Sequence, residues 1–160
     1  MMKKTKGQKT WLLNGKLHRK GGPALIYANG RKEWYINGEH HREDGPAIEL
    51  ANGDKEWWIK GLRHRTDGPA IDCKGEDRYW FVHGLRHRTD GPAIEHANGK
   101  QKWYIKGMLH REDGPAIEYQ FGTQSWHLEG ILIPFNDFEK TLMKIIDDRK
   151  FTDYQLLYEI

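Results

Sequence analysis

A period of 23 residues runs through most of this chain and limits what it can fold into. Tryptophan marks the period, at Trp11, Trp34, Trp57, Trp80, Trp103 and Trp126. A Gly-Pro pair and a His-Arg pair keep the same spacing, beginning at Gly22-Pro23 and His18-Arg19. Periods of this length are typical of repeat proteins, in which each unit packs mainly on its neighbours. The sequence therefore predicts an elongated array of similar units.

Each unit contains two short runs of β-prone residues, separated by turn residues. In the second unit, Asn37-Gly38 and Asn52-Gly53 are signals for two-residue hairpin turns, in which both residues need a positive φ. The pair Gly45-Pro46 indicates a further bend just before the second strand. We expect two antiparallel strands per unit, with the His-Arg pair in the longer connection between them.

Alternation along the strands predicts what each face of the sheet carries. Trp34 and Ile36 should share one face, and we expect Ile48 of the second strand to join them. Glu49 should then lie on the opposite face. That opposite face would also carry a series of rings, namely Tyr35, Trp58, Phe81, Tyr104 and His127. With two strands per unit, successive units should rise by about 9–10 Å.

The unit resembles the MORN-type β-hairpin repeat, in the form written Trp-Tyr-Ile-Asn-Gly-x-x-His-Arg-x-Asp-Gly-Pro-Ala that occurs in bacteria, phages and giant viruses. The likeness extends from Trp11 to about Gly130. It implies a curved open sheet used for binding or assembly, with no shared chemistry. The predicted fold class is thus all-β: a single-layer antiparallel β-meander of tandem hairpin units with a short C-terminal helical cap.

The two ends of the chain should differ from the array at residues 11–133, which has five full units and a partial sixth. Residues 1–10 have the composition of a flexible basic tail. Residues 134–160 have a helical pattern, with Asn136 as an N-cap and Thr152 beginning a second short helix. Both helices are expected to cover the last hairpin. The strand at Trp11 would be an uncovered edge, which predicts a homodimer or a bound partner there.

Composition and charge exclude some classes of partner. The net charge of +3, with 31% charged residues, gives a mildly basic surface of mixed sign, so nucleic acid is not an expected partner. The single cysteine, Cys73, allows no internal disulfide. No apolar run is long enough for a signal peptide or a membrane helix. We therefore expect a cytoplasmic protein with no membrane partner.

The repeated His-Arg pair has two interpretations, and the sequence leaves both open. A row of guanidinium groups along one rim of the array could hold phosphates or carboxylates. Each arginine also lies two residues before an aspartate in four of the units, as Arg42 does before Asp44. Such a pair could instead brace the bend that leads into the second strand.

Departures from the repeat point to the middle of the array. The third and fourth units add Arg63 and Arg86 where other units have histidine or leucine. They also carry Trp58 and Phe81 in the aromatic series, where the second and fifth units have tyrosine. Arginine beside aromatic rings is the composition that stacks bases and clamps phosphates. The candidate ligand-binding residues are Arg63, His64, Arg65, Arg86, His87, Arg88, Trp58, Phe81 and Tyr104.

Neither metal binding nor catalysis is expected. Successive histidines of the series should lie one unit rise apart, too far to share a zinc ion. An active site is one asymmetric group of residues, whereas these groups recur in every unit. We expect a non-catalytic binding protein without a cofactor. It would be a repeat scaffold for protein–protein interaction or inhibition, such as a phage or bacterial accessory or counter-defence factor. The alternative is sequestration of an anionic nucleotide-type molecule by the central residues.

Overall fold

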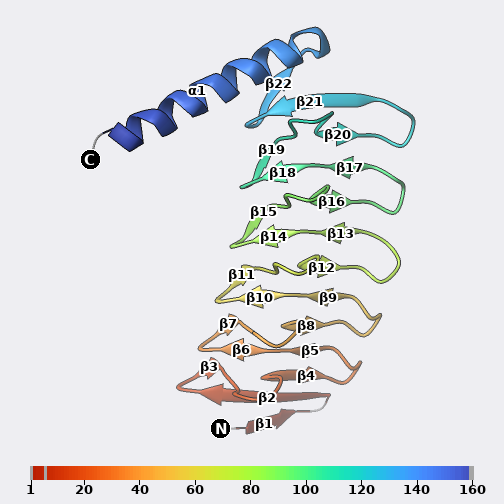
Figure 1. Ribbon diagram of the computed structural model, residues 1–160. Helices are drawn as coiled ribbons and strands as arrows, with labels where there is room; N and C mark the ends of the chain where they lie inside the picture. The colour runs from red at the N-terminus through yellow and green to blue at the C-terminus, as the bar shows by residue number, and fades with distance from the viewer. Residues whose placement is uncertain (1, 6, 159–160) are drawn as a thin grey trace.

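The computed structural model describes residues 2–5 and 7–158 of the chain. Short antiparallel strands are stacked one after another from the N-terminus, and one helix crosses the far end (Figure 1). The all-β meander expected from the repeat is therefore confirmed. Within this described part, no helix is both long and apolar enough to cross a membrane.

One 14-stranded antiparallel sheet runs the length of the array, and four two-stranded hairpins continue its units to one side. The strands of the long sheet are β1 (Met2–Thr5), β2 (Gln8–Leu13), β3 (Lys16–Leu17), β4 (Leu25–Tyr27), β5 (Lys32–Glu33), β8 (Ile48–Glu49), β9 (Lys55–Glu56), β12 (Ile71–Asp72), β13 (Arg78–Tyr79), β16 (Ile94–Glu95), β17 (Gln101–Lys102), β20 (Ile117–Glu118), β21 (Gln124–Leu128) and β22 (Ile131–Ile133). The hairpins are β6 (Tyr35–Ile36) with β7 (Glu39–His40), β10 (Trp58–Ile59) with β11 (Leu62–Arg63), β14 (Phe81–Val82) with β15 (Leu85–Arg86), and β18 (Tyr104–Ile105) with β19 (Met108–Leu109).

In the four middle units the tryptophan lies where the first strand of the hairpin is interrupted, whereas Trp11 and Trp126 lie inside the continuous strands β2 and β21. In the second unit, Trp34 stands between β5 and β6. Its N–H donates to the carbonyl of Ala47 at 2.8 Å, and its carbonyl accepts from the N–H of His41 at 3.1 Å. Both backbone groups of the tryptophan are thus paired across the hairpin. The N–H of Arg42 then donates to the carbonyl of Trp58 at 3.0 Å, which joins this unit to the next.

The two turns of a unit have different geometry. At Asn37-Gly38 both residues have positive φ, 54° and 91°, as a two-residue hairpin turn requires. At Asn52-Gly53 only the glycine does, with φ of 98°. There the N–H of Leu50 donates to the carbonyl of Asp54, and the N–H of Gly53 donates to the carbonyl of Leu50. The expectation of a second two-residue turn was therefore wrong: this is a three-residue loop that ends in a glycine bulge.

The register of the sheet corrects the expected faces. Ile48 pairs with Glu33 of β5 and with Glu56 of β9, so its side chain lies on the face of Tyr35, not of Trp34. Glu49 pairs with Lys32 instead and lies on the tryptophan face. The error arises from the connection 41–47. The number of residues in this connection decides which face the side chains of the next strand take, and no turn rule predicts that number.

Alanine and isoleucine make the core of the array. The alanine that follows Gly-Pro in each unit is completely buried, at Ala24, Ala47, Ala70, Ala93 and Ala116. The residue after it is almost as buried in four of these units, with 5% exposure at Leu25 and Ile48, 3% at Ile94 and 8% at Ile117, whereas Ile71 is partly exposed. Because alanine is small, the tryptophan and arginine side chains on its face can pack directly over the backbone. The array therefore has two thin packed layers, one on each face of the sheet.

At the N-terminus, residues 2–5 form an edge strand rather than a tail without regular structure. β1 pairs antiparallel with β2 in the register Met2↔Trp11, and β2 pairs on its other side with β4. The strand that carries Trp11 is therefore covered by β1, and the open edge of the sheet lies at β1. An extended segment pairs here because the exposed N–H and C=O groups of β2 offer it partners.

At the C-terminus there is one helix where two were expected. A short 3₁₀ turn, η1 (Phe135–Asp137), contains Asn136 and leads into α1 (Phe138–Tyr158). The helix passes through Thr152 without a break, because neither glycine nor proline occurs in it. Its first turns lie on the last hairpin, where Phe138 is 7% exposed and the ring of Phe135 lies 4.8 Å from that of Trp126. The rest of α1 projects past the strands (Figure 1).

Candidate functional site

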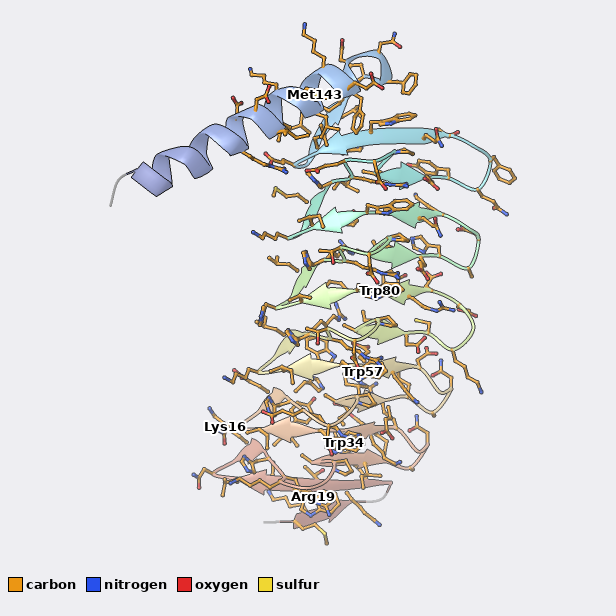
Figure 2. All side chains as sticks on the ribbon, in the orientation of Figure 1. Lys16, Arg19, Trp34, Trp57, Trp80 and Met143 are labelled. Carbon is orange, nitrogen blue, oxygen red and sulfur yellow. The ribbon has the colours of Figure 1, made fainter. Side chains whose placement is uncertain are left out.

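The two faces of the sheet differ in chemistry. We call one the brace face; it carries the tryptophans of the repeat and the His-Arg pairs. We call the other the aromatic face; it carries Tyr35, Trp58, Phe81, Tyr104 and His127 on the side of the hairpins. Trp34, Trp57 and Trp80 form a column along the array (Figure 2).

On the brace face, arginine ties each unit together. The guanidinium of Arg42 lies 4.2 Å from the ring centre of Trp34. It donates to Asp44 at 2.9 Å, to the carbonyl of Pro46 at 3.2 Å and to Glu49 at 3.1 Å. These donors hold the pKa of the Asp44 carboxyl below its usual range, through the hydrogen bond first and the charge of Arg42 second.

The same arrangement recurs along the array. The arginine-to-tryptophan distances are 3.9 Å for Arg19 and Trp11, 3.9 Å for Arg65 and Trp57, 4.1 Å for Arg88 and Trp80, and 4.0 Å for Arg111 and Trp103. The predicted pairs with aspartate are present at Asp44, Asp67, Asp90 and Asp113. A Cβ on Gly91 would lie 2.9 Å from Cζ of Arg88, so any larger residue before the proline would displace the guanidinium from this position. The sequence motif Arg-x-Asp-Gly-Pro is thus one packed structure.

The histidine beside each arginine joins consecutive units. Nδ1 of His64 accepts a hydrogen bond from the backbone N–H of His83 at 3.2 Å, and Nδ1 of His87 accepts one from Lys106 at 3.1 Å. Both donors belong to the hairpin turn of the following unit. Burial, and then the charge of His83, lower the pKa of His64, which favours the neutral imidazole that this acceptor role requires.

On the aromatic face, rings and cations alternate along four units. His40 lies 4.1 Å from the ring of Tyr35 and 5.4 Å from that of Trp58. Arg63 follows, 4.7 Å from Trp58 and 5.6 Å from Phe81. Arg86 continues the series, 5.7 Å from Phe81 and 5.6 Å from Tyr104. We call this run, from Tyr35 to Tyr104, the cation–aromatic series.

A buried carboxylate anchors the start of the series. Glu33 is 2% exposed, and it accepts from the hydroxyl of Tyr35 at 2.6 Å and from Nε2 of His40 at 3.0 Å. Arg31 pairs with its other oxygen at 2.7 Å. Burial alone would raise the pKa of Glu33, but the hydrogen bonds from His40 and Tyr35 and the charge of Arg31 outweigh it and hold the pKa at about 2. At this end of the aromatic face the carboxylate of Glu33 is therefore ionised, and Arg31 balances its negative charge.

Positive charge is not neutralised at the other end of the series. Arg86 is the only arginine of the described residues whose guanidinium donates to neither a carboxylate nor a carbonyl. Lys102, which occupies in its unit the place of Glu33, has its pKa lowered by burial and then by the charges of Lys100 and Arg86. Asp77 is the nearby acid, but the hydroxyl of Tyr79 donates to it at 2.6 Å and other donors occupy it as well.

The structure divides the predicted ligand-binding residues between the two faces. Trp58, Arg63, Phe81, Arg86 and Tyr104 lie together in the cation–aromatic series. His64, Arg65, His87 and Arg88 lie on the brace face, where each is already bonded within the array. One ligand of small size cannot contact both sets across a single sheet.

Sequence reasoning missed Lys100 and Lys102. At the position that faces isoleucine in the sheet, the chain has Glu33 and Glu56 but then Tyr79 and Lys102. This change of charge within a regular repeat is visible in the sequence. It gains meaning only when the register shows that the position lies beside the cations of the aromatic face.

Other parts of the surface are less suited to a ligand. A groove of about 980 Å³ lies on the brace face near α1, but Arg88, Arg111 and Arg149 in its wall are paired with carboxylates. Among the described residues, no group of three His, Cys, Asp or Glu side chains could hold a metal ion. Burial and the neighbouring carboxylates, Asp54 first, raise the pKa of the Cys73 thiol. A thiol in such surroundings is a weak nucleophile.

A scan against protein-family models finds no match to this chain, and a search of curated proteins finds no similar sequence. The architecture itself is that of a β-hairpin repeat.

Proposed function

We propose that this chain is a non-catalytic binding scaffold and that the aromatic face is the surface with which it contacts another protein. The observation that carries the proposal is the difference between the faces. The brace face repeats the same internal contacts in unit after unit, whereas the aromatic face changes its charges from unit to unit. Identical contacts serve folding, and side chains that vary within a repeat are free to serve recognition.

The exposed part of the cation–aromatic series has the composition of a protein contact surface. Tryptophan, tyrosine and arginine are the residues that most often carry binding energy at interfaces. Trp58 and Tyr104 are only partly buried, and the side chain of Arg63 is 38% exposed. Curvature of an open array would place several units against one partner at the same time.

The resemblance to MORN-type repeats belongs to this proposal, because that family implies binding or assembly without shared chemistry. The raised pKa of Cys73 also suits a protein that does no thiol chemistry. A cytoplasmic inhibitor or accessory factor of a phage or bacterium is the role we favour. A homodimer formed through the open edge at β1 is part of the same proposal, since an unpaired strand edge invites a second chain.

Neighbouring residues on opposite faces give a direct test. A photocrosslinking amino acid in place of Arg63 would report contacts of the aromatic face, and the same amino acid in place of Leu62, which is 49% exposed, would report contacts of the other face. We expect discrete crosslinks to a protein partner in cells from position 63 and few from position 62. Equal crosslinking from the two positions, or none from position 63, would contradict the proposal.

A second candidate function is sequestration of an anionic nucleotide. The specific observation in its favour is the guanidinium of Arg86, which lies between Phe81 and Tyr104 without a carboxylate among the described residues. Native mass spectrometry of freshly purified protein is the first test. An added mass of a few hundred daltons that disappears in the Arg86→Gln variant supports this function, and a mass of the bare chain counts against it.

A further inference from the structure

The net charge of the aromatic face changes along the array. In the second unit Glu33 pairs with Arg31 at 2.7 Å and lies 3.0 Å from Nε2 of His40, and in the third unit Arg63 lies 3.4 Å from Glu56. In the fourth unit Tyr79 takes the place of the glutamate beside Arg86. The face is therefore neutralised in its N-terminal half and positive in its C-terminal half.

Three cations make up the positive half. Arg86 faces Tyr104, Lys102 lies between Ile94 and Ile117 in the sheet, and Nζ of Lys100 lies 4.2 Å from the ring centre of Tyr119. Among the described residues, none of the three has a carboxylate within 4.0 Å. Lys102 is partly buried next to two other positive charges, and such an arrangement costs stability unless an anion is bound.

The size of this patch limits the ligand. The three cations come from two consecutive units, and two units span about 20 Å of the array at the expected rise. A nucleic acid strand that followed the array would next meet the second and third units, where Glu33 and Glu56 already pair with the arginines and leave no free cation for its phosphates. A short run of phosphates fits the patch, and a long polyanion does not.

The rings beside the cations add a second requirement. Tyr119 is 41% exposed and Tyr104 is partly buried, so both have surface left for a planar group. Stacking of a base on such rings adds to the binding of its phosphates and tolerates different bases. A ligand with both phosphates and an aromatic ring would use the whole patch.

We propose that Arg86, Lys100 and Lys102 form a binding site for the phosphates of a nucleotide, with its base against Tyr104 or Tyr119. The inference rests on the second candidate function and moves its site from the centre of the array to the fourth and fifth units. Arg63 and the brace-face arginines Arg65 and Arg88 take no part in it.

Isothermal titration calorimetry on the full chain tests the site with ATP, GTP, tripolyphosphate and adenosine. ATP or GTP should bind, adenosine should give no measurable heat, and tripolyphosphate should bind about tenfold more weakly than ATP because it lacks the stacked base. In the Arg86→Gln/Lys102→Gln variant the nucleotide affinity should fall by at least about tenfold, since two charge-assisted contacts are lost. The control Lys20→Gln/Lys55→Gln removes the same charge at exposed sites outside the patch and should bind like the wild type.

Each adverse result has a definite meaning. The site is overturned if the wild type binds neither ATP nor GTP. It is also overturned if the Arg86→Gln/Lys102→Gln variant binds the nucleotide with the same affinity as the wild type. Equal affinity for tripolyphosphate and ATP overturns the role of the tyrosine rings. The scaffold proposal does not depend on these results, because the crosslinks from position 63 test it separately.

Thermal unfolding without ligand provides a second readout. If the cations are kept for binding, the Arg86→Gln/Lys102→Gln variant should melt at the same temperature as the wild type or higher, since repulsion between unpaired charges is relieved. A clear loss of stability would show that these cations support the fold, and that result would contradict the proposal.

Discussion

Nδ1 of His41 accepts a hydrogen bond at 3.1 Å from the backbone N–H of Lys60, which lies in the hairpin turn of the next unit. Lys60 has a φ of 49°, a conformation that costs energy for a residue with a Cβ. The turn directs two backbone N–H groups toward the preceding unit: the histidine binds that of Lys60, and the N–H of Gly61 donates to the carbonyl of His40 at 3.0 Å. This explains why the array accepts lysine at Lys60 and Lys106 where the first two units have asparagine.

Removal of this hydrogen bond should weaken the array by a similar amount in any unit. We expect His87→Phe to lower the free energy of unfolding by about 1 kcal/mol, because the N–H of Lys106 loses its acceptor while a ring of similar size remains. Urea unfolding followed by tryptophan fluorescence measures the change. His41→Phe should cost about as much and should add to His87→Phe, since the two sites are two units apart. An unchanged midpoint in both variants would show that water replaces the imidazole at no cost.

Asparagine should be better than lysine in these turns. Asn14 and Asn37 have φ values of 50° and 54°, close to the 49° of Lys106. Asparagine tolerates this region more easily, so Lys106→Asn is expected to stabilise the protein by about 0.5 kcal/mol. Thermal unfolding would detect a higher melting temperature. The substitution Lys20→Asn, at an exposed site outside the left-handed region, is the control and should bring no such gain.

Two arginines separated by one residue should respond differently to the same substitution. Arg88 lies against Trp80 at 4.1 Å and donates to Asp90 at 2.9 Å, whereas Arg86 has no such acceptor among the described residues. Lysine cannot reproduce the planar donor arrangement of arginine. Arg88→Lys should therefore lower the free energy of unfolding by about 2 kcal/mol, and Arg86→Lys should change it by less than about 0.5 kcal/mol. Urea unfolding of both variants decides, and equal effects would contradict the division into a brace face and an aromatic face.

The repeat and its hairpins could be predicted because they depend on local chemistry. A tryptophan every 23 residues and an Asn-Gly turn such as Asn37-Gly38 determine the unit and one of its turns without knowledge of tertiary contacts. The pairing of Arg42 with Asp44 was also foreseeable, because the two residues are neighbours in sequence.

The face of Ile48 could not be predicted, since it depends on how many residues the connection 41–47 takes up before pairing resumes. That error also placed Glu49 on the wrong face and concealed that it accepts from Arg42. The continuous helix was missed for a related reason. Thr152 is compatible with a helix start and also with a helix interior, and only the path of the chain distinguishes them.

The candidate site was predicted in part. Trp58, Arg63 and Arg86 stood out because they depart from the repeat, and the structure brings them together. His64 lies on the other face because successive residues alternate, and Arg65 reaches that face as well because β11 ends at Arg63 and the alternation stops there. Chain proximity is thus a poor guide to spatial grouping in a single sheet.

Stability in acid should depend on Glu33. Its folded-state pKa of about 2 lies below the 4.5 of an ordinary glutamate, so the unfolded chain takes up its proton first as the pH falls. The carboxylate therefore contributes stability above about pH 4.5, and this contribution is lost as the pH falls toward 2. We expect Glu33→Gln to lower the free energy of unfolding by roughly 2–3 kcal/mol near neutral pH, and the difference from the wild type should shrink steadily below pH 4.5. Urea unfolding at several pH values measures it. The exposed residue of β7 provides the control, since Glu39→Gln should have little effect at any pH. A difference that stays constant with pH would mean that the Glu33 site acts through packing and not through the charge of its carboxylate.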